Sequence, residues 1–395
     1  MHSDSHDILT RATEADRPAL YRSISLAFGG PVAGVDEWVS ASGLANQRVL
    51  RRADGGIGAS LLRIEMGQYW GGRSVPMLGI AGVTVPPESR GGGNAKRLMR
   101  ALVREAHREG WATSALFAST HSLYRAVGYE HAGSRFVFTV PLSRIDVHER
   151  GGEVVALGEG DNGRVRECYA RAAQRANGNL DRGEYIWSRI RKRWGVEYQG
   201  FGVVGSGGAL AGYVYLAQQR RPEGRYDVEV SDLAFETPGA GRRLLGFLRD
   251  FEMMGHDCTM YGGPTHPALT LLQQHRYKAE LKDYWLIRVT NLERAVGARG
   301  YARAVDAEVH LQVEDDVVDE HNGAWVLRVR NGAGEVRRGG KGEVRVTARG
   351  LAAVYSGFVT FAQARAQGWC EGSDGALCGA EGVFAGPHPW MTEMF

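Results

Sequence analysis

Between residues 80 and 110, the pattern of apolar and polar positions predicts a strand followed by a long helix. Ile80 to Val85 is an apolar, β-branched run that ends at two prolines, which is typical of a strand. From residue 94 onward, apolar side chains repeat at helical spacing until Gly110 stops the pattern. The connecting segment, Arg90 to Ala95, contains three consecutive glycines, so a glycine-rich loop leads into the helix.

The pattern continues with a second strand and a short helix. Ser114 to Ala118 is a short apolar run that predicts the strand, and Ser122 to Val127 fits a helix closed by Gly128. This places Tyr124 on a helix just beyond a strand.

Flanking segments complete a first domain that we expect to span residues 1–145. Residues 7 to 28 indicate a short strand and a helix, and residues 48–50, 59–66 and 77–85 indicate successive strands. Arg135 to Val140 predicts a strand that closes this unit. A polar, charged stretch follows, from Pro141 to Val154, and suits a linker.

A second domain, expected at residues 146–290, repeats the order of the first. Strands are predicted at residues 202–204, 212–217, 228–235, 259–262 and 283–289, and helices at residues 241–254 and 266–275. In a manual alignment Leu269 takes the place of Tyr124, and Glu236 or Thr237 that of Arg90. We therefore interpret the second unit as a degenerate copy that serves as a scaffold.

The remaining residues, 291–395, form a third α+β region. Strands are predicted at residues 307–313, 325–330 and 343–348, separated by Asn-Gly turn signals, and a mostly apolar helix at residues 350–365. The chain finishes on apolar and aromatic residues. Because ordinary termini are polar and fray, we expect this tail to dock onto the body of the protein.

Composition narrows the class of protein. The 395 residues carry 48 basic and 45 acidic side chains, so the total charge does not suggest a nucleic-acid partner, and the basic stretch from Arg189 to Arg193 fits a solvated helix face. No apolar run is long enough to cross a membrane, and the N-terminus lacks the core of a signal peptide, so we expect a cytoplasmic protein. The four cysteines are scattered and predict free thiols, with no metal site.

The glycine loop before the helix is suited to an anion. A helix N-terminus presents unpaired N–H groups and a positive dipole, and a pyrophosphate is a natural occupant. The loop lacks the Gly-Lys-Ser/Thr ending of a Walker site and has no acidic residue about twenty positions on for a dinucleotide ribose. A plain turn remains the alternative interpretation of the glycine run by itself.

The strand, Arg-x-x-Gly-x-Ala loop, long helix, strand and Leu-Tyr-Arg-x-x-Gly-Tyr together resemble the GNAT acyltransferase superfamily. The order of the three domains and the aromatic C-terminus further resemble the enhanced intracellular survival (Eis) acetyltransferases. This resemblance implies an α+β fold class, with two mixed-sheet GNAT domains, the second degenerate, and a sterol-carrier-protein-like domain whose end returns to the active site. It also implies a homo-oligomer, a hexamer in that family.

The resemblance implies a set of residues for acetyl-coenzyme A. The backbone of Val83 and Val85 is expected to pair with the pantetheine arm. The loop and the start of the helix are expected to hold the pyrophosphate, and Ser119 follows the next strand at the cofactor site. The loop residues concerned are Arg90, Gly91, Gly93, Asn94 and Ala95. Gly91 and Gly92 replace arginines that are common in the family.

The resemblance also implies the catalytic groups and an amine acceptor. Tyr124 matches the general acid, and the terminal carboxylate of Phe395 matches the general base. Phe28 and Trp38 lie in the region that borders the acceptor site, where an aromatic face attracts a cation. We therefore predict an N-acetyltransferase for polyamine- or aminoglycoside-like amines or for protein lysines. The alternatives are acylation with longer chains, or a lipid-binding protein that uses the third domain.

Overall fold

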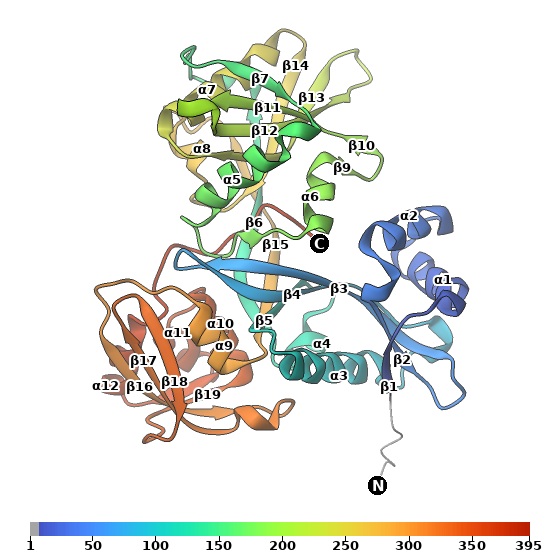
Figure 1. Ribbon diagram of the computed structural model, residues 1–395, viewed down its shortest axis with the longest axis vertical. Helices are drawn as coiled ribbons and strands as arrows, with labels where there is room; N and C mark the ends of the chain where they lie inside the picture. Colours follow the sequence, from blue (N-terminus) through green and yellow to red (C-terminus); the bar gives the residue numbers. More distant parts are fainter. Residues whose placement is uncertain (1–7) are drawn as a thin grey trace.

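The computed structural model describes residues 8–395, so residues 1–7 of the N-terminal stretch lie outside the described part. Figure 1 shows two units stacked along the long axis, with a third unit beside the lower one. One continuous 13-stranded sheet runs through the first two units, and a separate five-stranded sheet lies in the third. The predicted mixed-sheet architecture is therefore confirmed.

The first unit contains the predicted strands, and two of its helices lie between its first and second strands. Its helices are α1 (Arg17–Phe28), α2 (Val32–Ser42), α3 (Asn94–Glu109) and α4 (His121–Arg125). Its strands are β1 (Ile8–Arg11), β2 (Gln47–Arg51), β3 (Ile57–Trp70), β4 (Arg73–Thr84), β5 (Thr113–Phe117) and β6 (Glu130–Pro141). Helix α3 packs its apolar stripe, which includes Leu98 and Leu102, against the sheet. Helix α2 was not predicted from the sequence.

The second unit repeats this order with shorter helices. Its helices are α5 (Asn162–Ala173), α6 (Glu184–Arg191), α7 (Pro238–Arg249) and α8 (Pro267–Thr270). Its longer strands are β7 (Val154–Leu157), β11 (Gln199–Val204), β12 (Leu210–Arg220), β13 (Tyr226–Phe235), β14 (Gly255–Gly262) and β15 (Lys278–Val289). Three two-residue strands are β8 (Leu180–Asp181), β9 (Lys192–Arg193) and β10 (Val196–Glu197).

Strands β6 and β15 are shared between the two units. The sheet order is β1-β2-β3-β4-β5-β15-β6-β14-β13-β12-β11-β7. Trp285 to Val289 of β15 pair with β5, while Phe136 to Pro141 of β6 pair with β14. Arg135–Val140 is thus a strand as predicted, but it extends into the second unit instead of closing the first. Each exchanged strand covers a β-strand edge that would otherwise be exposed.

The third unit is a five-stranded sheet covered by helices. Its strands are β16 (Ala307–Glu314), β17 (Gly323–Arg330), β18 (Ala333–Arg338), β19 (Val344–Thr347) and β20 (Cys370–Gly372). Its helices are α9 (Leu292–Ala298), α10 (Ala348–Ser356), α11 (Phe361–Ala366) and α12 (Asp374–Glu381). Its core is continuous with that of the first unit, because Val75 and Met77 of β4 belong to the same cluster as Leu311 and Tyr355.

Two predicted helices are shorter than expected. The helix at residues 350–365 is divided into α10 and α11, because Gly357 adopts a left-handed conformation (φ 73°) that ends α10. The helix at residues 266–275 is reduced to α8. The backbone N–H of Gln273 donates to Asp146 at 2.9 Å instead of to a helical carbonyl, so the helix does not continue.

The chain ends in a partly buried tail, residues 387–395, that runs between the first two units (Figure 1). Ser134 of β6 donates its N–H to the Pro389 carbonyl at 3.2 Å, and Arg135 donates to the Thr392 carbonyl at 2.8 Å. Trp390 and Met391 are buried. The predicted docking of an apolar tail is therefore confirmed.

Within residues 8–395, no helix combines the length and the apolar character needed to cross a membrane. The four cysteines form no disulfide, and three of them are buried.

Candidate active site

The first unit contains a split between two parallel strands. Strands β4 and β5 pair only from Met77–Thr113 to Ile80–Leu116, and β4 then continues to Thr84 while β5 pairs with β15 on its other side. A β-bulge in β4 adds to the divergence, since Ser60 of β3 faces Thr84 and Leu62 faces Ala81. The backbone of Ala81 to Val85 therefore presents an unpaired edge on the side of the split.

The loop beyond this edge ends at the N-terminus of α3. Gly91 and Gly93 adopt positive φ angles of 81° and 74°, which favour glycine. Gly93 is the N-cap residue and supplies no side chain to the helix. Within residues 8–395 no acceptor meets the backbone N–H groups of Asn94, Ala95 and Lys96. These donors and the helix dipole make the position suitable for an anion.

Two side chains fix the shape of this loop. Arg90 is exposed and donates to the Val85 carbonyl at 3.3 Å, which brings its guanidinium back to the end of β4. Asn94 is buried, and its amide donates to the Ser89 carbonyl at 2.7 Å. Arg90 thus adds a positive charge beside the free N–H groups, and Asn94 holds the turn that aims them.

Tyr124 lies on α4 and is 7% exposed. Its ring packs edge-on against Tyr129, with ring centroids 6.2 Å apart. Burial raises the pKa of Tyr124 to about 12, so its hydroxyl keeps its proton at physiological pH. This hydroxyl makes no hydrogen bond within the described residues, which leaves it free to donate to a ligand.

The last residue, Phe395, reaches the split from the far end of the chain. Its ring packs edge-on against Phe117 of β5 at 5.6 Å, and a Cβ added to Gly79 of β4 would lie 3.0 Å from it. Gly79 and Phe117 lie on the two strands that diverge. The terminal carboxylate forms no ion pair within residues 8–395, so it is free to accept a proton.

A hydrogen-bonded chain connects α2, α6 and the tail beside this position. Trp38 covers Gly82, where an added Cβ would lie 2.6 Å from the indole, and donates its Nε1–H to the Tyr185 hydroxyl at 2.8 Å. Arg189 donates to the same hydroxyl at 3.0 Å and to the Met394 carbonyl at 3.4 Å. Arg189 is therefore a structural contact of the tail and not part of a fully solvated helix face.

Two other predicted site residues, Phe28 and Ser119, lie at the surface. Phe28 is 60% exposed at the end of α1, and Ser119 is exposed after β5. The structure brings Trp38, Phe395 and the edge of β4 together but records no contact of Phe28 with them. Tyr185 and Arg189 were not predicted as site residues because they lie on α6 of the second unit and belong to no sequence motif. Their only signal in the sequence is their spacing, an aromatic and a basic residue four positions apart on one helix face.

The second unit contains a corresponding split that its own chain partly occupies. Strands β13 and β14 pair in parallel only from Tyr226–Gly255 to Glu229–Thr259. Arg182 is fully buried there and binds Asp232 at 2.6 and 2.8 Å, and it also pairs with Glu393 of the tail. At the start of α7, Thr237 accepts a hydrogen bond from the Ala240 N–H at 3.2 Å. The anion site of this copy is therefore capped by its own side chain.

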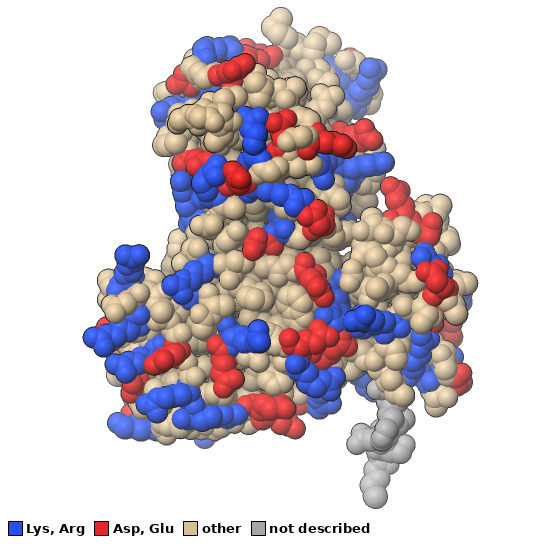
Figure 2. Space-filling view, viewed as in Figure 1, with Lys and Arg blue, Asp and Glu red and all other residues tan. Residues whose placement is uncertain are grey.

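Charges and possible metal ligands do not mark a separate site. Figure 2 shows Lys and Arg interspersed with Asp and Glu over the visible face. Among residues 8–395, Asp227, His256 and Asp257 could converge on a cation. Arg221 already binds Asp227 at 2.9 Å and Asp257 at 3.1 Å, and its charge opposes a cation there. The absence of a metal stays a prediction.

The split sheet, the helix N-terminus beside it and the buried tyrosine define an acyltransferase architecture. Residues 9–132 and 178–289 each match an acetyltransferase (GNAT) domain family, and residues 292–392 match the sterol carrier protein domain family. A GCN5-related N-acetyltransferase from Anabaena variabilis is 30% identical, with a TM-score of 0.93 over 98% of this chain and 100% of that chain. The chain belongs to the GCN5-related N-acetyltransferase (GNAT) family.

Other relatives share the same three-unit arrangement. A GCN5-related N-acetyltransferase from Kribbella flavida is 27% identical, with a TM-score of 0.88 over 98% of each chain. Eis1 from Mycobacterium abscessus is 19% identical, with a TM-score of 0.79 over 98% of this chain and 100% of that chain, so the fold is Eis-like. An uncharacterized N-acetyltransferase from Streptomyces griseus is 24% identical over 349 residues, 82% of this chain and 83% of that protein.

Proposed function

We propose that this acyltransferase moves the acetyl group of acetyl-coenzyme A to primary amines, either of polyamine- or aminoglycoside-like small molecules or of protein lysines. The position of Phe395 carries this proposal. Its ring packs against Gly79 of β4 and Phe117 of β5, and the thioester would lie between these two strands. This position of the ring supports the proposal that the terminal carboxylate takes a proton from the attacking amine.

The cofactor fits the residues of the first split. The backbone of Val83 and Val85, which pairs with no strand on the side of the split, would hold the pantetheine amides in the manner of an added strand. Gly91, Gly93, Asn94 and Ala95 would hold the pyrophosphate through their backbone N–H groups, with Arg90 adding a charge-assisted hydrogen bond. Open space supports this assignment, because a Cβ added to Gly91 or Gly93 meets no atom within 4 Å. Ser119 stands at the exposed end of β5.

Direct transfer requires the amine nitrogen to lose two protons and the sulfur to gain one. The Phe395 carboxylate accepts the first proton from the ammonium, and the free amine then attacks the thioester carbonyl. Collapse of the tetrahedral species expels a thiolate, Tyr124 donates a proton to the sulfur, and the second proton from the nitrogen restores the Tyr124 hydroxyl. A phenol with a pKa of about 12 is a weaker acid than a thiol near 8.5, so the transfer depends on close positioning as the C–S bond breaks.

The acceptor would approach between α2 and α6. Trp38 offers a ring that can face a cation, and the Phe395 carboxylate attracts the same charge. Arg189 stands beside the tail and opposes a second positive charge at that side. Phe28, which is exposed at the C-terminal end of α1, stays a proposed contact for the distal part of a long acceptor.

Binding of acetyl-coenzyme A is the direct test. Isothermal titration calorimetry should give one site per chain, and no binding would refute the proposal. Release of free thiol in the presence of a panel of amines should then identify the acceptor. Propionyl and longer thioesters in the same assay separate acetyl transfer from longer-chain acylation.

The lipid-binding alternative has less support. The interior of the third unit is filled by fully buried side chains, including Val313, Val346, Ala352 and Tyr355. A native mass spectrum showing a co-purified lipid would favour it nevertheless.

Assembly and location remain proposals that follow from the family. We propose a homo-oligomer, a hexamer by analogy with the Eis acetyltransferases, in the cytoplasm. Light scattering on the purified chain tests the first part, and a mass near one chain would refute it.

A further inference from the structure

An open cleft of about 590 Å³ lies where the first unit meets the third. The first turn of α3 and the end of α4 form its wall on the first unit. The end of β16 and the start of α10 form its wall on the third unit. A cleft of this volume has room for a small ligand or for one end of a larger one. Because both units build it, a ligand bound there would contact two domains.

Two arginines from different units share one buried carboxylate in this cleft. Arg125, the last residue of α4, donates to Oε1 of Glu130 at 2.8 and 3.1 Å, and Arg349 of α10 donates to Oε2 at 2.6 and 3.0 Å. The Glu130 side chain is fully buried, whereas 35% of the Arg125 side chain and 34% of the Arg349 side chain remain exposed. Within residues 8–395, the Nη1 group of each guanidinium has no hydrogen-bond partner. Each arginine therefore keeps donors for a ligand.

A third positive charge comes from the first turn of α3. Lys96 lines the cleft, is exposed and forms no ion pair among the described residues. It lies two residues after Asn94, at the helix end whose N–H groups are free. On the opposite wall, the Trp369 ring lies 5.2 Å from the Arg349 guanidinium and helps to fix its position. The cations of this cleft are thus contributed by both domains.

Three carboxylates also line the cleft, but each has an arginine of its own. These arginines are not among the residues that line the cleft. The pairs are Asp315 with Arg288, Asp316 with Arg100 at 3.0 Å, and Glu314 with Arg345 at 3.4 Å. Lys96 and the one arginine that Glu130 does not balance therefore leave two uncompensated positive charges in the cleft.

This excess of charge matches a phosphate group. A phosphomonoester carries about 1.5 to 2 negative charges near pH 7, and guanidinium N–H groups bind its oxygens through charge-assisted hydrogen bonds. A carboxylate would balance only one of the two positive charges. Arginine forks and a mobile lysine are both common partners of phosphate oxygens.

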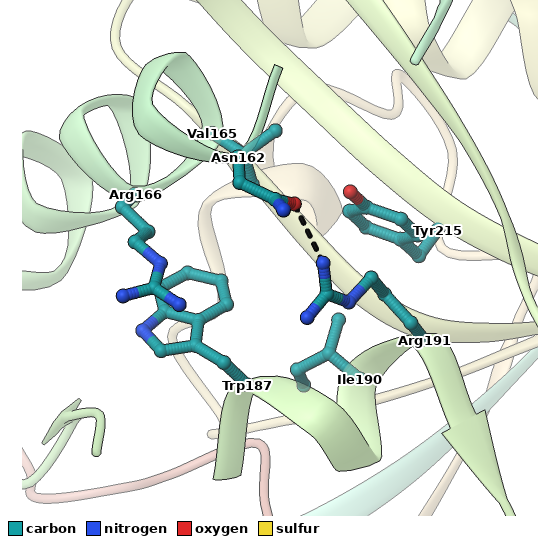
Figure 3. A pocket seen from close by; sticks show the side chains of 7 residues that line it. All are labelled: Asn162, Val165, Arg166, Trp187, Ile190, Arg191 and Tyr215. Carbon is teal, nitrogen blue, oxygen red and sulfur yellow. Dashed lines mark hydrogen bonds between the residues drawn. The ribbon is translucent and has the colours of Figure 1, made fainter. Parts of the chain in front are cut away.

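Arginines that line a pocket do not always leave charge for a ligand, as the pocket beside α6 shows (Figure 3). There Arg166 has its own carboxylate, Glu184, at 2.7 Å, and Arg191 donates to the Asn162 side chain at 2.6 Å. The free volume of that pocket is only about 10 Å³, room for one water molecule. Arg166 therefore offers a matched control for the arginines of the larger cleft.

We propose that the cleft between the first and third domains binds a phosphate dianion, held by Arg125, Arg349 and Lys96. Two sources of this group fit. The 3′-phosphate of coenzyme A is one, because Lys96 adjoins the helix end proposed for the pyrophosphate, and this source rests on the proposed function of the first domain. A free phosphate ion is the other and does not depend on that function. With either source, the third domain supplies a ligand-binding residue, Arg349.

Phosphorus NMR on the full chain tests the site with inorganic phosphate. Phosphate should bind saturably, and acetate, a monoanion, should displace it only at about tenfold higher concentration. Arg349→Gln and Lys96→Gln should each weaken phosphate binding by about fivefold. Glu130 retains Arg125 in the first variant, and Lys96 has no ion pair to lose, so both proteins should fold.

Calorimetry with two cofactors distinguishes the sources of the phosphate group. If the 3′-phosphate is the ligand, acetyl-coenzyme A should bind about tenfold more tightly than its 3′-dephospho form, and Arg349→Gln should remove most of this difference. Equal affinities for the two cofactors, together with saturable binding of phosphate, assign the site to the free ion. Arg166→Gln is the control and should change neither measurement.

The proposal is overturned if phosphate does not bind saturably and removal of the 3′-phosphate does not weaken cofactor binding. It is also overturned if acetate displaces phosphate at equal concentration, or if Arg349→Gln has no larger effect than Arg166→Gln. A chain that binds phosphate but neither cofactor would refute the acetyl transfer proposed for the first domain and would leave the phosphate site in place.

Discussion

The two GNAT domains differ in what occupies the split between their parallel strands. In the first, the split meets an uncapped helix N-terminus, Arg90 and a buried tyrosine. In the second, Thr237 caps the helix, and Arg182 with the tail occupies part of the opening. Both domains keep a split between parallel strands, so we expect the side chains around the split, and not the architecture alone, to govern cofactor binding.

The largest effect should come from the tyrosine. Tyr124→Phe should lower turnover by about 10²–10³-fold, because proton donation to the leaving thiolate is lost. Its KM for acetyl-coenzyme A should change little, since the ring remains. Thiol release under saturating acetyl-coenzyme A measures this. Leu269→Tyr, at the corresponding place in the second domain, should not alter turnover; a Tyr124→Phe enzyme with more than half of wild-type turnover would contradict the assignment.

Extending the chain beyond Phe395 should have the next largest effect. Two added residues move the carboxylate from the split, and turnover should fall by about 10²-fold through loss of the general base. Calorimetry should show unchanged affinity for acetyl-coenzyme A. The same two residues added before Met1 serve as the control, and full activity with the C-terminal extension would exclude the carboxylate.

Arg90→Glu makes the first loop resemble the second. Its KM for acetyl-coenzyme A should rise by about tenfold, since a carboxylate replaces a charge-assisted donor beside the pyrophosphate. Arg90→Gln should raise this KM less than Arg90→Glu does. Added salt should reduce the difference in KM between Arg90→Glu and the wild-type enzyme. In the opposite direction, Glu236→Arg should leave the stoichiometry at one acetyl-coenzyme A per chain, because Thr237 still caps α7 and Arg182 still occupies part of the second split. A second acetyl-coenzyme A site in Glu236→Arg would show that the Glu236 carboxylate alone prevents binding in the second domain.

The smallest effect concerns stability against pH. The pKa of His266 is about 4 in the folded protein and about 6.5 when unfolded, so between these values the unfolded state binds more protons. The free energy of unfolding should therefore fall as the pH drops from about 6.5 toward 4, by about 1 kcal/mol at about pH 5.5 for this group. Denaturant melts should show a shallower pH dependence for His266→Gln, and the wild-type dependence for His121→Gln. Equal slopes for all three proteins would disprove the assignment.

The local patterns were sufficient to predict β4, α3, β5 and α4 in the first domain. Each rests on neighbouring residues: a β-branched run, one helical stripe and a glycine stop. The order of the strands was not predictable in this way. Strand β15 pairs with β5 although the two strands lie far apart in the chain. By composition, β6 and β15 could each complete the sheet of either domain.

The candidate site shows the same limit. Arg90 and Tyr124 stand in a recognisable motif, and Trp38 and Phe395 followed from a resemblance. Tyr185 and Arg189 lie in another domain and take their role from the hydrogen bonds that α6 makes with Trp38 and Met394. Helix α2 was missed because three glycines and a proline near it weaken the helical pattern, although Val35 and Val39 bury one face of it.

The exchange of β6 and β15 has a consequence for biosynthesis. The first domain does not complete its sheet until residues 285–289 have left the ribosome, because they form the strand beside β5. Until then, the edge of β5 is open to pairing with other nascent chains. A gene fragment that encodes only residues 1–145 would leave that edge permanently exposed and should yield aggregates. The first two domains are therefore expected to fold as one unit.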